Sequence, residues 1–189
     1  MKKTKSYLRN ILRIFQELHN EVMMEIIQGN QPALFRAHEE FDFNNPQHDP
    51  VDLANKLIQT MNDNNILSLS APQIGFNYKV FVMRGSPDAV VCFNPRVIVV
   101  SESKIVLDET CGSFPGLAVK IKRPQQIKVR YQNILGDTHT FTYIGMTARQ
   151  FLHEMDHING VNFLSRAHPM LLKRAMTAQK ALKRKNKAL

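Results

Sequence analysis

Residues 153–157 read His-Glu-Met-Asp-His and lie in a segment, 147–159, that contains good helix formers and neither proline nor glycine. Residues four apart on an α-helix lie on one face, one turn apart, so His153 and His157 can direct their imidazoles to a single metal ion. Glu154 follows the first histidine and faces the neighbouring coordination position, where it can take a proton from a metal-activated water molecule. This stretch predicts a metal-binding helix of a hydrolytic enzyme, with the rest of the fold arranged around it.

The third protein ligand that such a metal site needs is expected to be Cys111. It stands in Asp-Glu-Thr-Cys-Gly-Ser-Phe-Pro-Gly (108–116), between a polar stretch and a turn rich in glycine and proline, which is an unusual setting for a core residue. The other cysteine, Cys92, lies in Val-Val-Cys-Phe (90–93), where a small buried hydrophobic residue is expected. Asp156, inside the motif, either supports a histidine as a hydrogen-bond partner or lies on the surface.

The segments on either side of the motif predict an α+β fold. Apolar residues at three- and four-residue spacing predict an amphipathic helix over 5–28, and Asp52 is expected to cap a second helix that ends near residue 62. Pro169 stands where it would begin a last helix, over 170–186. Short β-branched runs bounded by turn residues predict antiparallel strands at 80–83, 90–93, 97–100, 105–107, 117–121, 127–131 and 138–143. We therefore expect several short antiparallel strands around a central helix, with an extra N-terminal helix and a basic C-terminal helix.

Composition excludes several classes of protein. The chain has 189 residues, of which 43% are hydrophobic, so it is long enough and apolar enough to bury a core as one domain. Its two cysteines cannot form a disulfide-rich scaffold, which favours a reducing compartment. Its apolar runs are far shorter than the roughly 20 residues that a membrane helix needs. The first residues lack the apolar core of a secretory signal, so we expect a cytoplasmic location, with an organelle matrix as the alternative.

Both ends of the chain are basic. The net charge is +9, and residues 1–16 carry five basic residues and no acidic one, while residues 157–189 carry eight basic residues and no acidic one. Basic ends attract polyanions such as RNA or anionic lipid, although lysine-rich termini can also act only as solvated segments. Composition leaves both interpretations open.

Three stretches of this sequence resemble the signature motifs of the peptide deformylases, in the family order. Residues 153–157 are similar to the third motif, and Glu-Thr-Cys-Gly-Ser (109–113) resembles the second, usually Glu-Gly-Cys-Leu-Ser. Ser-Ala-Pro-Gln (70–73) resembles the end of the first, usually Gly-x-Gly-Leu-Ala-Ala-Pro-Gln. The resemblance covers about residues 31–165. It divides the chain into an N-terminal amphipathic helical extension over 1–30, a deformylase-like catalytic domain over 31–165, and a basic C-terminal helix or tail over 166–189.

The resemblance implies a metal-dependent hydrolase that removes the formyl group from the N-terminal formyl-methionine of newly made proteins. It implies one divalent metal ion, Fe(II) in the cell, with Zn or Ni able to occupy the same site in a purified sample. The ligand types do not choose between these metals, because a thiolate and two imidazoles suit several divalent ions. The implied metal ligands are Cys111, His153 and His157. The implied catalytic residues are Glu154 as general base and then acid, with the Gln73 side-chain amide and the Gly112 backbone N–H as donors to the oxyanion.

A pocket for the methionine side chain is expected near the metal. Leu67, Ser68, Leu69 and Met146 are the candidate substrate-binding residues, together with the region around Phe151. Apolar residues of this kind are more often ordinary core residues than parts of a pocket. The predicted substrates are N-formyl-methionyl peptides and nascent chains.

The chain departs from the usual motifs at five positions. Ile66 and Ser68 stand where the first motif has two glycines, and Thr110 and Gly112 replace the glycine and leucine of the second. Leu152 replaces the glutamine that usually precedes the first histidine. None of these changes removes a metal ligand or the base. We expect Ile66 and Ser68 to narrow the substrate cleft and Gly112 to remove part of an apolar wall. Together the five changes are expected to alter substrate preference and efficiency in an atypical member of the family.

Two other functions remain as alternatives. A zincin-type metallopeptidase would need a third ligand after His157, and His168 is the candidate, since no acidic residue follows Asp156. A degenerate deformylase-like protein would only bind the ribosome through its basic ends. In an active enzyme, too, the basic segment 170–187 is expected to dock on ribosomal RNA near the exit tunnel, where the substrate emerges.

Overall fold

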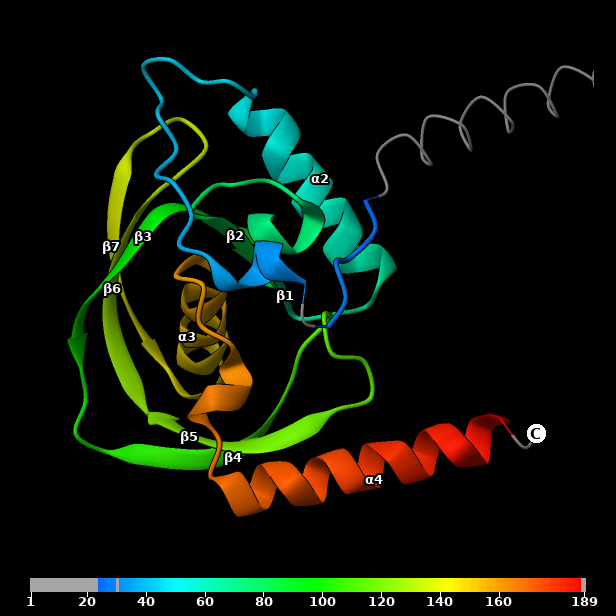
Figure 1. The fold of residues 1–189 in the computed structure, drawn as a ribbon. Coiled ribbons are helices and arrows are strands. Elements are labelled where there is room, and N and C mark those ends of the chain that lie inside the picture. Colours follow the sequence, from blue (N-terminus) through cyan, green and yellow to red (C-terminus); the bar gives the residue numbers. More distant parts are fainter. Residues whose placement is uncertain (1–23, 30, 188–189) are drawn as a thin grey trace, which may run out of the picture.

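Two antiparallel sheets and the helix between them form the centre of an α+β structure (Figure 1). The computed structural model describes residues 24–29 and 31–187. Its α-helices are α2 (Pro50–Asp63), α3 (Gly145–Ile158) and α4 (Pro169–Lys187), and its short 3-10 helices are η1 (Pro32–Phe35), η2 (Ala71–Ile74) and η3 (Phe163–Arg166). The fold class predicted from the sequence is confirmed.

The larger sheet has five strands in the order β1-β2-β3-β6-β7, and the smaller sheet pairs β4 with β5. Every pairing between these strands is antiparallel. Their bounds are β1 (Ser68–Ser70), β2 (Val80–Met83), β3 (Val90–Val100), β4 (Lys104–Thr110), β5 (Ala118–Pro124), β6 (Gln126–Gln132) and β7 (Thr138–Ile144).

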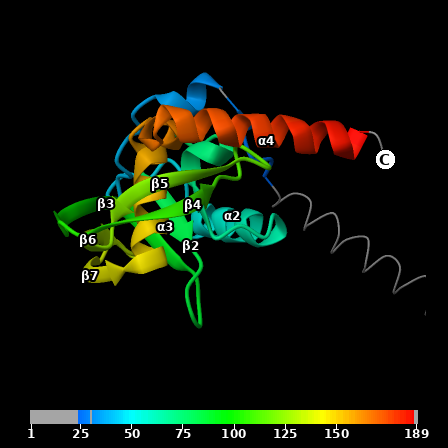
Figure 2. The same ribbon diagram turned by 90° about the horizontal axis from the view of Figure 1, so that it is seen from below.

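Helix α3 contacts both sheets because it has apolar or buried side chains on both sides. Ala148, Phe151 and Ile158 belong to the core cluster that also contains residues of β2 and β6. On the other side, the His153 ring lies 5.1 Å from the ring of Phe163, which packs in the cluster beneath β5. The helix that carries the predicted metal ligands is thereby packed in the interior (Figures 1 and 2).

Helix α3 ends next to a glycine that no other residue can replace without strain. Gly160 has φ +70°, and a Cβ built on it would lie 2.5 Å from the backbone carbonyl carbon of Arg36. Such a contact is shorter than any that real Cβ atoms make, and the backbone conformation itself disfavours L side chains. The glycine therefore ends the helix and lets the backbone at Arg36 approach it closely.

Helix α2 begins three residues earlier than expected, because its cap is Asp49 and not the predicted Asp52. The side chain of Asp49 accepts hydrogen bonds from the backbone N–H groups of Val51 and Asp52. Pro50 is the first helical residue, where its missing N–H costs nothing. Asp52 instead pairs with Lys56 one turn further on, at 2.7 Å.

The runs 90–93 and 97–100, predicted as two strands, form one strand, β3. Its pairing with β6 shifts register between Phe93 and Arg96. Asn94 adopts φ 49° there, and its side chain holds the bend by donating to the Phe41 carbonyl at 2.9 Å. This irregularity accommodates Pro95, which has no N–H for the ladder. The strand predicted at 117–121 also differs, since β5 runs from Ala118 to Pro124.

The N-terminal end of the described chain differs from the predicted helix. The helix predicted over 5–28 lies mostly outside the described residues, and its predicted last turn is wrong, because residues 24–28 have no helical structure. Their backbone donors bond to other segments, as with Ile27 N–H to the Gln73 carbonyl at 2.8 Å.

Helix α4 confirms the predicted C-terminal helix and begins at Pro169. Its first half packs on the molecule through Leu172 and Ala175, which contact the cluster beneath β5. Nε2 of Gln179 donates to the Pro115 carbonyl at 2.8 Å, and the turns after Gln179 extend away from the body (Figures 1 and 2). Among the helices that the structure describes, none is long and apolar enough to cross a membrane.

Candidate active site

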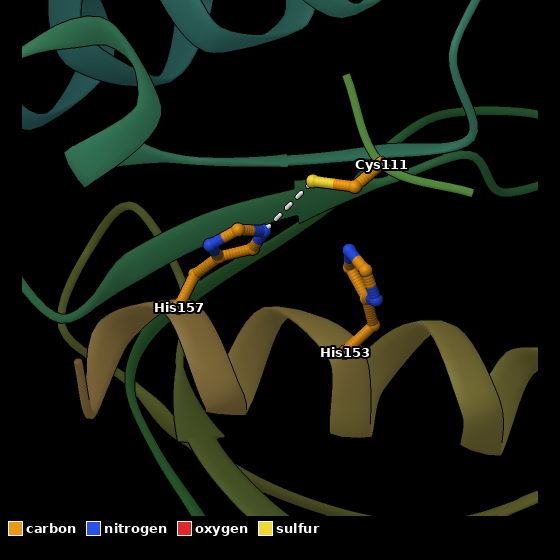
Figure 3. Close-up of side chains that lie close together, drawn as sticks. All are labelled: Cys111, His153 and His157. Carbon is orange, nitrogen blue, oxygen red and sulfur yellow. Dashed lines mark hydrogen bonds between the residues drawn. The ribbon is translucent and has the colours of Figure 1, made fainter. Parts of the chain in front are cut away.

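Cys111, His153 and His157 form a buried cluster of potential metal ligands. Their ligand atoms all lie within 4.8 Å of one another, and the Cys111 sulfur is 3.2 Å from Nε2 of His157. Figure 3 shows both histidine rings projecting from α3 toward the sulfur, which comes from the loop after β4. One thiolate and two imidazoles at this separation suit a tetrahedral divalent metal with one position left open. The structure thus brings together the three residues that the sequence suggested as ligands.

The orientation of His153 is fixed by Glu109, to which the sequence analysis gave no role. Nδ1 of His153 lies 3.2 Å from Oε2 of Glu109, which leaves Nε2 for the cluster. Burial lowers the pKa of His153, but hydrogen bonds with Cys111 and Glu109 outweigh it and raise the pKa to about 10. The groups around this ring therefore stabilise a positive charge at this place, whether a proton on the imidazole or a cation bound to it. Burial lowers the pKa of His157, and the charges of His153 and Arg123 lower it further.

Glu109 is itself held by two buried arginines. Its Oε1 accepts from Nε of Arg123 at 2.7 Å and from Nη1 of Arg149 at 2.6 Å, and its Oε2 accepts from Nη2 of Arg123 at 2.9 Å. Burial alone would raise the pKa of Glu109, but the hydrogen bonds from His153 and Arg123 lower it to about 2. Glu109 therefore stays ionised and holds the His153 ring in one orientation.

Asp156 fits neither of the two alternatives that the sequence left open. It is only 5% exposed, so it is not a surface carboxylate, and its partners are arginines rather than a histidine. Oδ2 accepts from Nη1 of Arg123 at 2.9 Å, and Oδ1 accepts from Nη2 of Arg166 at 2.6 Å. Asp156 thus extends the ionic network from Arg123 to the segment that follows α3.

The Glu154 carboxyl lies beside the ligand cluster with one oxygen unpaired. The residue is 1% exposed, and within the described part of the chain Oε2 has no hydrogen-bond partner. Burial raises its pKa, against the lowering effects of His153 and of hydrogen bonds with Ser68 and Ser70. Glu154 also lines the cavity described below, and a carboxyl there with a raised pKa and an unpaired oxygen is suited to proton exchange.

The Gln73 amide has one fixed orientation. Its Oε1 accepts from both the backbone N–H and the hydroxyl of Ser70, each at 2.9 Å. Its Nε2 therefore faces the other way, 3.6 Å from the Cys111 sulfur and 3.2 Å from the Ser113 hydroxyl. Both Gln73 and Gly112 line the same cavity as Glu154. Within residues 24–29 and 31–187, no hydrogen bond uses the Gly112 N–H, so this donor is free to meet a ligand.

A cavity of about 500 Å³ opens onto the cluster. Leu67, Ser68 and Met146 line it, as expected for substrate-binding residues, and Ile66 lines it as well. Leu69 does not line the cavity, because alternation along β1 points its side chain into the core, where it is fully buried. Phe151 is likewise a core residue.

His168, the candidate third ligand of a zincin-type site, lies outside the cluster. Its Nδ1 accepts from the backbone N–H of Met170 at the start of α4. Among the described residues, the third potential ligand of the group precedes the two histidines in the chain and is Cys111. The arrangement is not that of a peptidase with a downstream ligand.

Comparison with known proteins agrees with this geometry. A family model described as polypeptide deformylase matches residues 23–173. The chain belongs to the polypeptide deformylase family. It is 37% identical over 133 residues to a peptide deformylase of Thermotoga petrophila, covering 68% of this chain and 81% of the relative. It is 28% identical over 170 residues to the chloroplastic/mitochondrial peptide deformylase 1B of Arabidopsis thaliana, covering 87% and 62%.

Solved structures of the family share the fold. The crystal structure of a Synechococcus elongatus peptide deformylase in complex with actinonin superposes with a TM-score of 0.77 at 25% identity, over 83% of this chain and 86% of that chain. The members named in these comparisons are enzymes, so the family is one of enzymes, and the predicted enzyme class is confirmed.

Proposed function

We propose that this chain is a metal-dependent hydrolase that removes the formyl group from the N-terminal formyl-methionine of newly made proteins. The observation that carries the proposal is the shared cavity. It joins a Cys-His-His cluster, a buried carboxyl with a free oxygen, and two donors suited to an oxyanion. Hydrolysis of a formamide needs an activated water, a polarised carbonyl and a proton for the departing amine.

Cys111, His153 and His157 would hold the metal, which we expect to be Fe(II) in the cell and Zn or Ni in a purified sample. The metal supplies Lewis acidity, which lowers the pKa of water and polarises a carbonyl oxygen. The chain's own contribution is to keep three donors within 4.8 Å in a buried pocket and to orient one imidazole through Glu109.

Glu154 acts as general base and then as general acid. Its free Oε2 takes a proton from the attacking water, and the resulting carboxylic acid gives that proton to the departing amine nitrogen. Its raised pKa brings the acid and base forms closer in energy than they are for an exposed glutamate. Burial of the carboxyl is the main cause of this shift.

Gln73 and Gly112 stabilise the negative charge that develops on the formyl oxygen. Ser70 holds the carbonyl end of the Gln73 amide, so the NH₂ end is already directed toward the cluster before substrate binds. The unused Gly112 N–H is the second donor. Donors that need no reorganisation during the reaction give the largest stabilisation.

Leu67, Ser68 and Met146 contact the first residue of the substrate, a methionine. The cavity is lined by more apolar than polar surface, and its volume suits a side chain and the adjoining backbone. Leu69 supports this wall from the core rather than from the cavity.

Helix α4 would dock on ribosomal RNA near the exit of the nascent chain. Within the described residues no ion pair is formed by Lys173, Arg174, Lys180 or Lys183, and the last turns of the helix extend away from the body. Contact with phosphate would release counterions from RNA. Reversing Lys180, Lys183 and Arg184 to Glu should weaken ribosome co-sedimentation and leave turnover of a short peptide unchanged; equal co-sedimentation would reassign α4 as a solvated helix.

We also propose a cytoplasmic or organellar-matrix location and three parts for the chain: an N-terminal extension over 1–30, a catalytic domain over 31–165 and a basic tail over 166–189. The first boundary needs adjustment, because residues 24–29 bond to the loops of Gln73 and Ser113. A boundary before residue 24 agrees with these contacts.

Glu154→Gln is the decisive test of the proposed function. The variant should retain about one divalent metal per chain and lose about 10²–10⁴-fold in turnover of formyl-Met-Ala-Ser, measured as release of formate. Glu102→Gln, the same change at an exposed position, is the control. Wild-type protein that binds metal and releases no formate would favour the degenerate ribosome-binding alternative. Near-normal turnover by Glu154→Gln would refute the role of Glu154.

A further inference from the structure

Residues 24–29, which we call the strap, bond to the two connecting segments, or loops, that carry the proposed oxyanion donors: the short helical turn η2 with Gln73 and the loop after β4 with Gly112. The strap starts beside α2, where the Met24 N–H lies 3.4 Å from the Thr60 hydroxyl, and it is drawn in blue in Figure 1. From there it runs along the cavity, which Ile26 and Gln28 help to line. The strap contains none of the residues to which a chemical role has been given.

Backbone hydrogen bonds join the strap to both loops at once. The Ile27 N–H donates to the Gln73 carbonyl at 2.8 Å, and the Gly29 N–H donates to the Ser113 carbonyl at 2.7 Å. Gln73 lies in η2 and Ser113 lies in the loop after β4, so these two short bonds connect segments that are 40 residues apart in the chain. Loops of this kind are otherwise the more mobile parts of a fold.

The strap also holds Gly112 from two sides. Nε2 of Gln28 donates to the Gly112 carbonyl at 3.1 Å. The space above the Gly112 Cα is filled by Ile26 and Ile66, whose Cδ1 atoms would each lie 3.3 Å from a Cβ at this position. A glycine has more backbone freedom than any other residue, so its N–H needs such neighbours to keep one direction.

We propose that the strap is a positioning element of the active site. It holds the Gln73 amide and the Gly112 N–H in a fixed relation, so that both meet the developing oxyanion without reorganisation. This inference rests on the proposed function of Gln73 and Gly112. Gln28 acts through the Gly112 carbonyl, and Ile26 acts by filling the space that Gly112 leaves.

The first test replaces Gln28, which is exposed and so tolerates substitution without loss of the fold. Gln28→Met keeps the length of the side chain and removes its donor. We expect kcat for formyl-Met-Ala-Ser to fall about three- to tenfold, less than the loss of a whole oxyanion donor, with KM within twofold and metal content unchanged. Gln59→Met makes the same change on α2, away from the cavity, and should match wild type. A rise in KM alone, or a loss of metal, would refute a positioning role.

The second test is a mutant cycle between Ile26 and Gly112. Ile26→Ala leaves the space above Gly112 open, while Gly112→Ala brings a Cβ to 3.3 Å from the Ile26 side chain. Each single variant should lower kcat. The double variant should recover, because the new methyl group occupies the space that Ile26 has left. If the fold-loss in kcat of the double variant equalled the product of the two single losses, the filling role of Ile26 would be refuted.

A measurement independent of turnover separates failure of this inference from failure of the proposed function. Amide hydrogen exchange at 111–113 should be about three- to tenfold faster in Gln28→Met than in wild type, as expected for loss of one hydrogen bond. Wild-type protein without deformylase activity would refute the proposed function. The exchange rates at 111–113 would still test whether the strap holds the Gly112 segment. Unchanged exchange and unchanged kcat in both Gln28→Met and Ile26→Ala would overturn the inference.

Discussion

Replacing Glu109 by Gln is expected to destabilise the protein by about 3–5 kcal/mol and to weaken metal binding. Glu109 is 5% exposed and accepts hydrogen bonds from Arg123 and Arg149, so its charge balances two buried guanidinium groups. Loss of one member of a buried ion pair costs about 3–5 kcal/mol. A pKa of about 2 in place of the ordinary 4.5 corresponds to about 3 kcal/mol, which agrees.

The same substitution should act on the metal through His153. Glutamine keeps the size of the side chain and one acceptor oxygen, but it cannot satisfy both arginines and the imidazole as the carboxylate does. Loss of such a partner behind a ligating histidine typically weakens metal affinity about 10–100-fold. We therefore expect weaker binding in competition with a chelator, together with the fall in stability.

Thermal and urea unfolding of the metal-free proteins measure the first effect. A loss of 3–5 kcal/mol lowers the Tm by about 6–20 °C in a chain of this size. Asp108→Asn is the matched control, because this neighbouring carboxylate is 59% exposed and, among residues 24–29 and 31–187, forms its ion pair with Lys120 at the surface. Surface pairs of this kind are worth about 0–1 kcal/mol. If Glu109→Gln unfolded like Asp108→Asn and bound metal like wild type, the supporting role of Glu109 would be wrong.

Three further outcomes are expected. Cys111→Ser should reduce the metal content of the purified protein well below one per chain, measured by elemental analysis, and unchanged metal content would exclude Cys111 as a ligand. Gly116→Ala should cost about 1–2 kcal/mol, because Gly116 has a φ near +70° and open space around it. Gly160→Ala should lower stability well beyond that, because Gly160 has a similar φ and its new Cβ would press against the backbone of Arg36. Because the pKa of Glu109 is lowered, its stabilisation is complete above about pH 4.5 and is lost as the pH falls toward 2, so the difference in unfolding free energy between wild type and Glu109→Gln should shrink over that range.

Local patterns in the sequence were sufficient for the helix of the site but not for its supporting network. The positions of His153 and His157 follow from the four-residue spacing of one helix, which needs no knowledge of the rest of the fold. Glu109 reaches Arg149 across 40 residues of sequence, and no local pattern reports such a contact. The motif stretch around Cys111 contained Glu109, but only the three-dimensional arrangement shows which charges it balances.

Errors at element ends have identifiable physical causes. Asp49 and Asp52 are both reasonable caps, and Pro50 was the signal that decides between them, because proline favours the first helical position. The predicted helix over 5–28 failed at 24–28 for a different reason. The apolar spacing there is compatible with a helix, but the bonds of Ile27 and Gly29 to other loops replace helical ones, and tertiary contacts of this kind override local propensity.

The departures from the family motifs are coupled in space, which a comparison of motifs one at a time does not reveal. Gly112 stands where the second motif usually has leucine, and Ile66 stands where the first usually has glycine. In the structure the Ile66 side chain lies against the bare face of Gly112, with Ile26 beside it. Apolar volume missing from one segment is thus supplied by two others, and Ile66 fills this space as well as lining the cleft. The narrowing expected from Ile66 is therefore offset by the volume that Gly112 lacks, so the two departures preserve one wall of the cavity together.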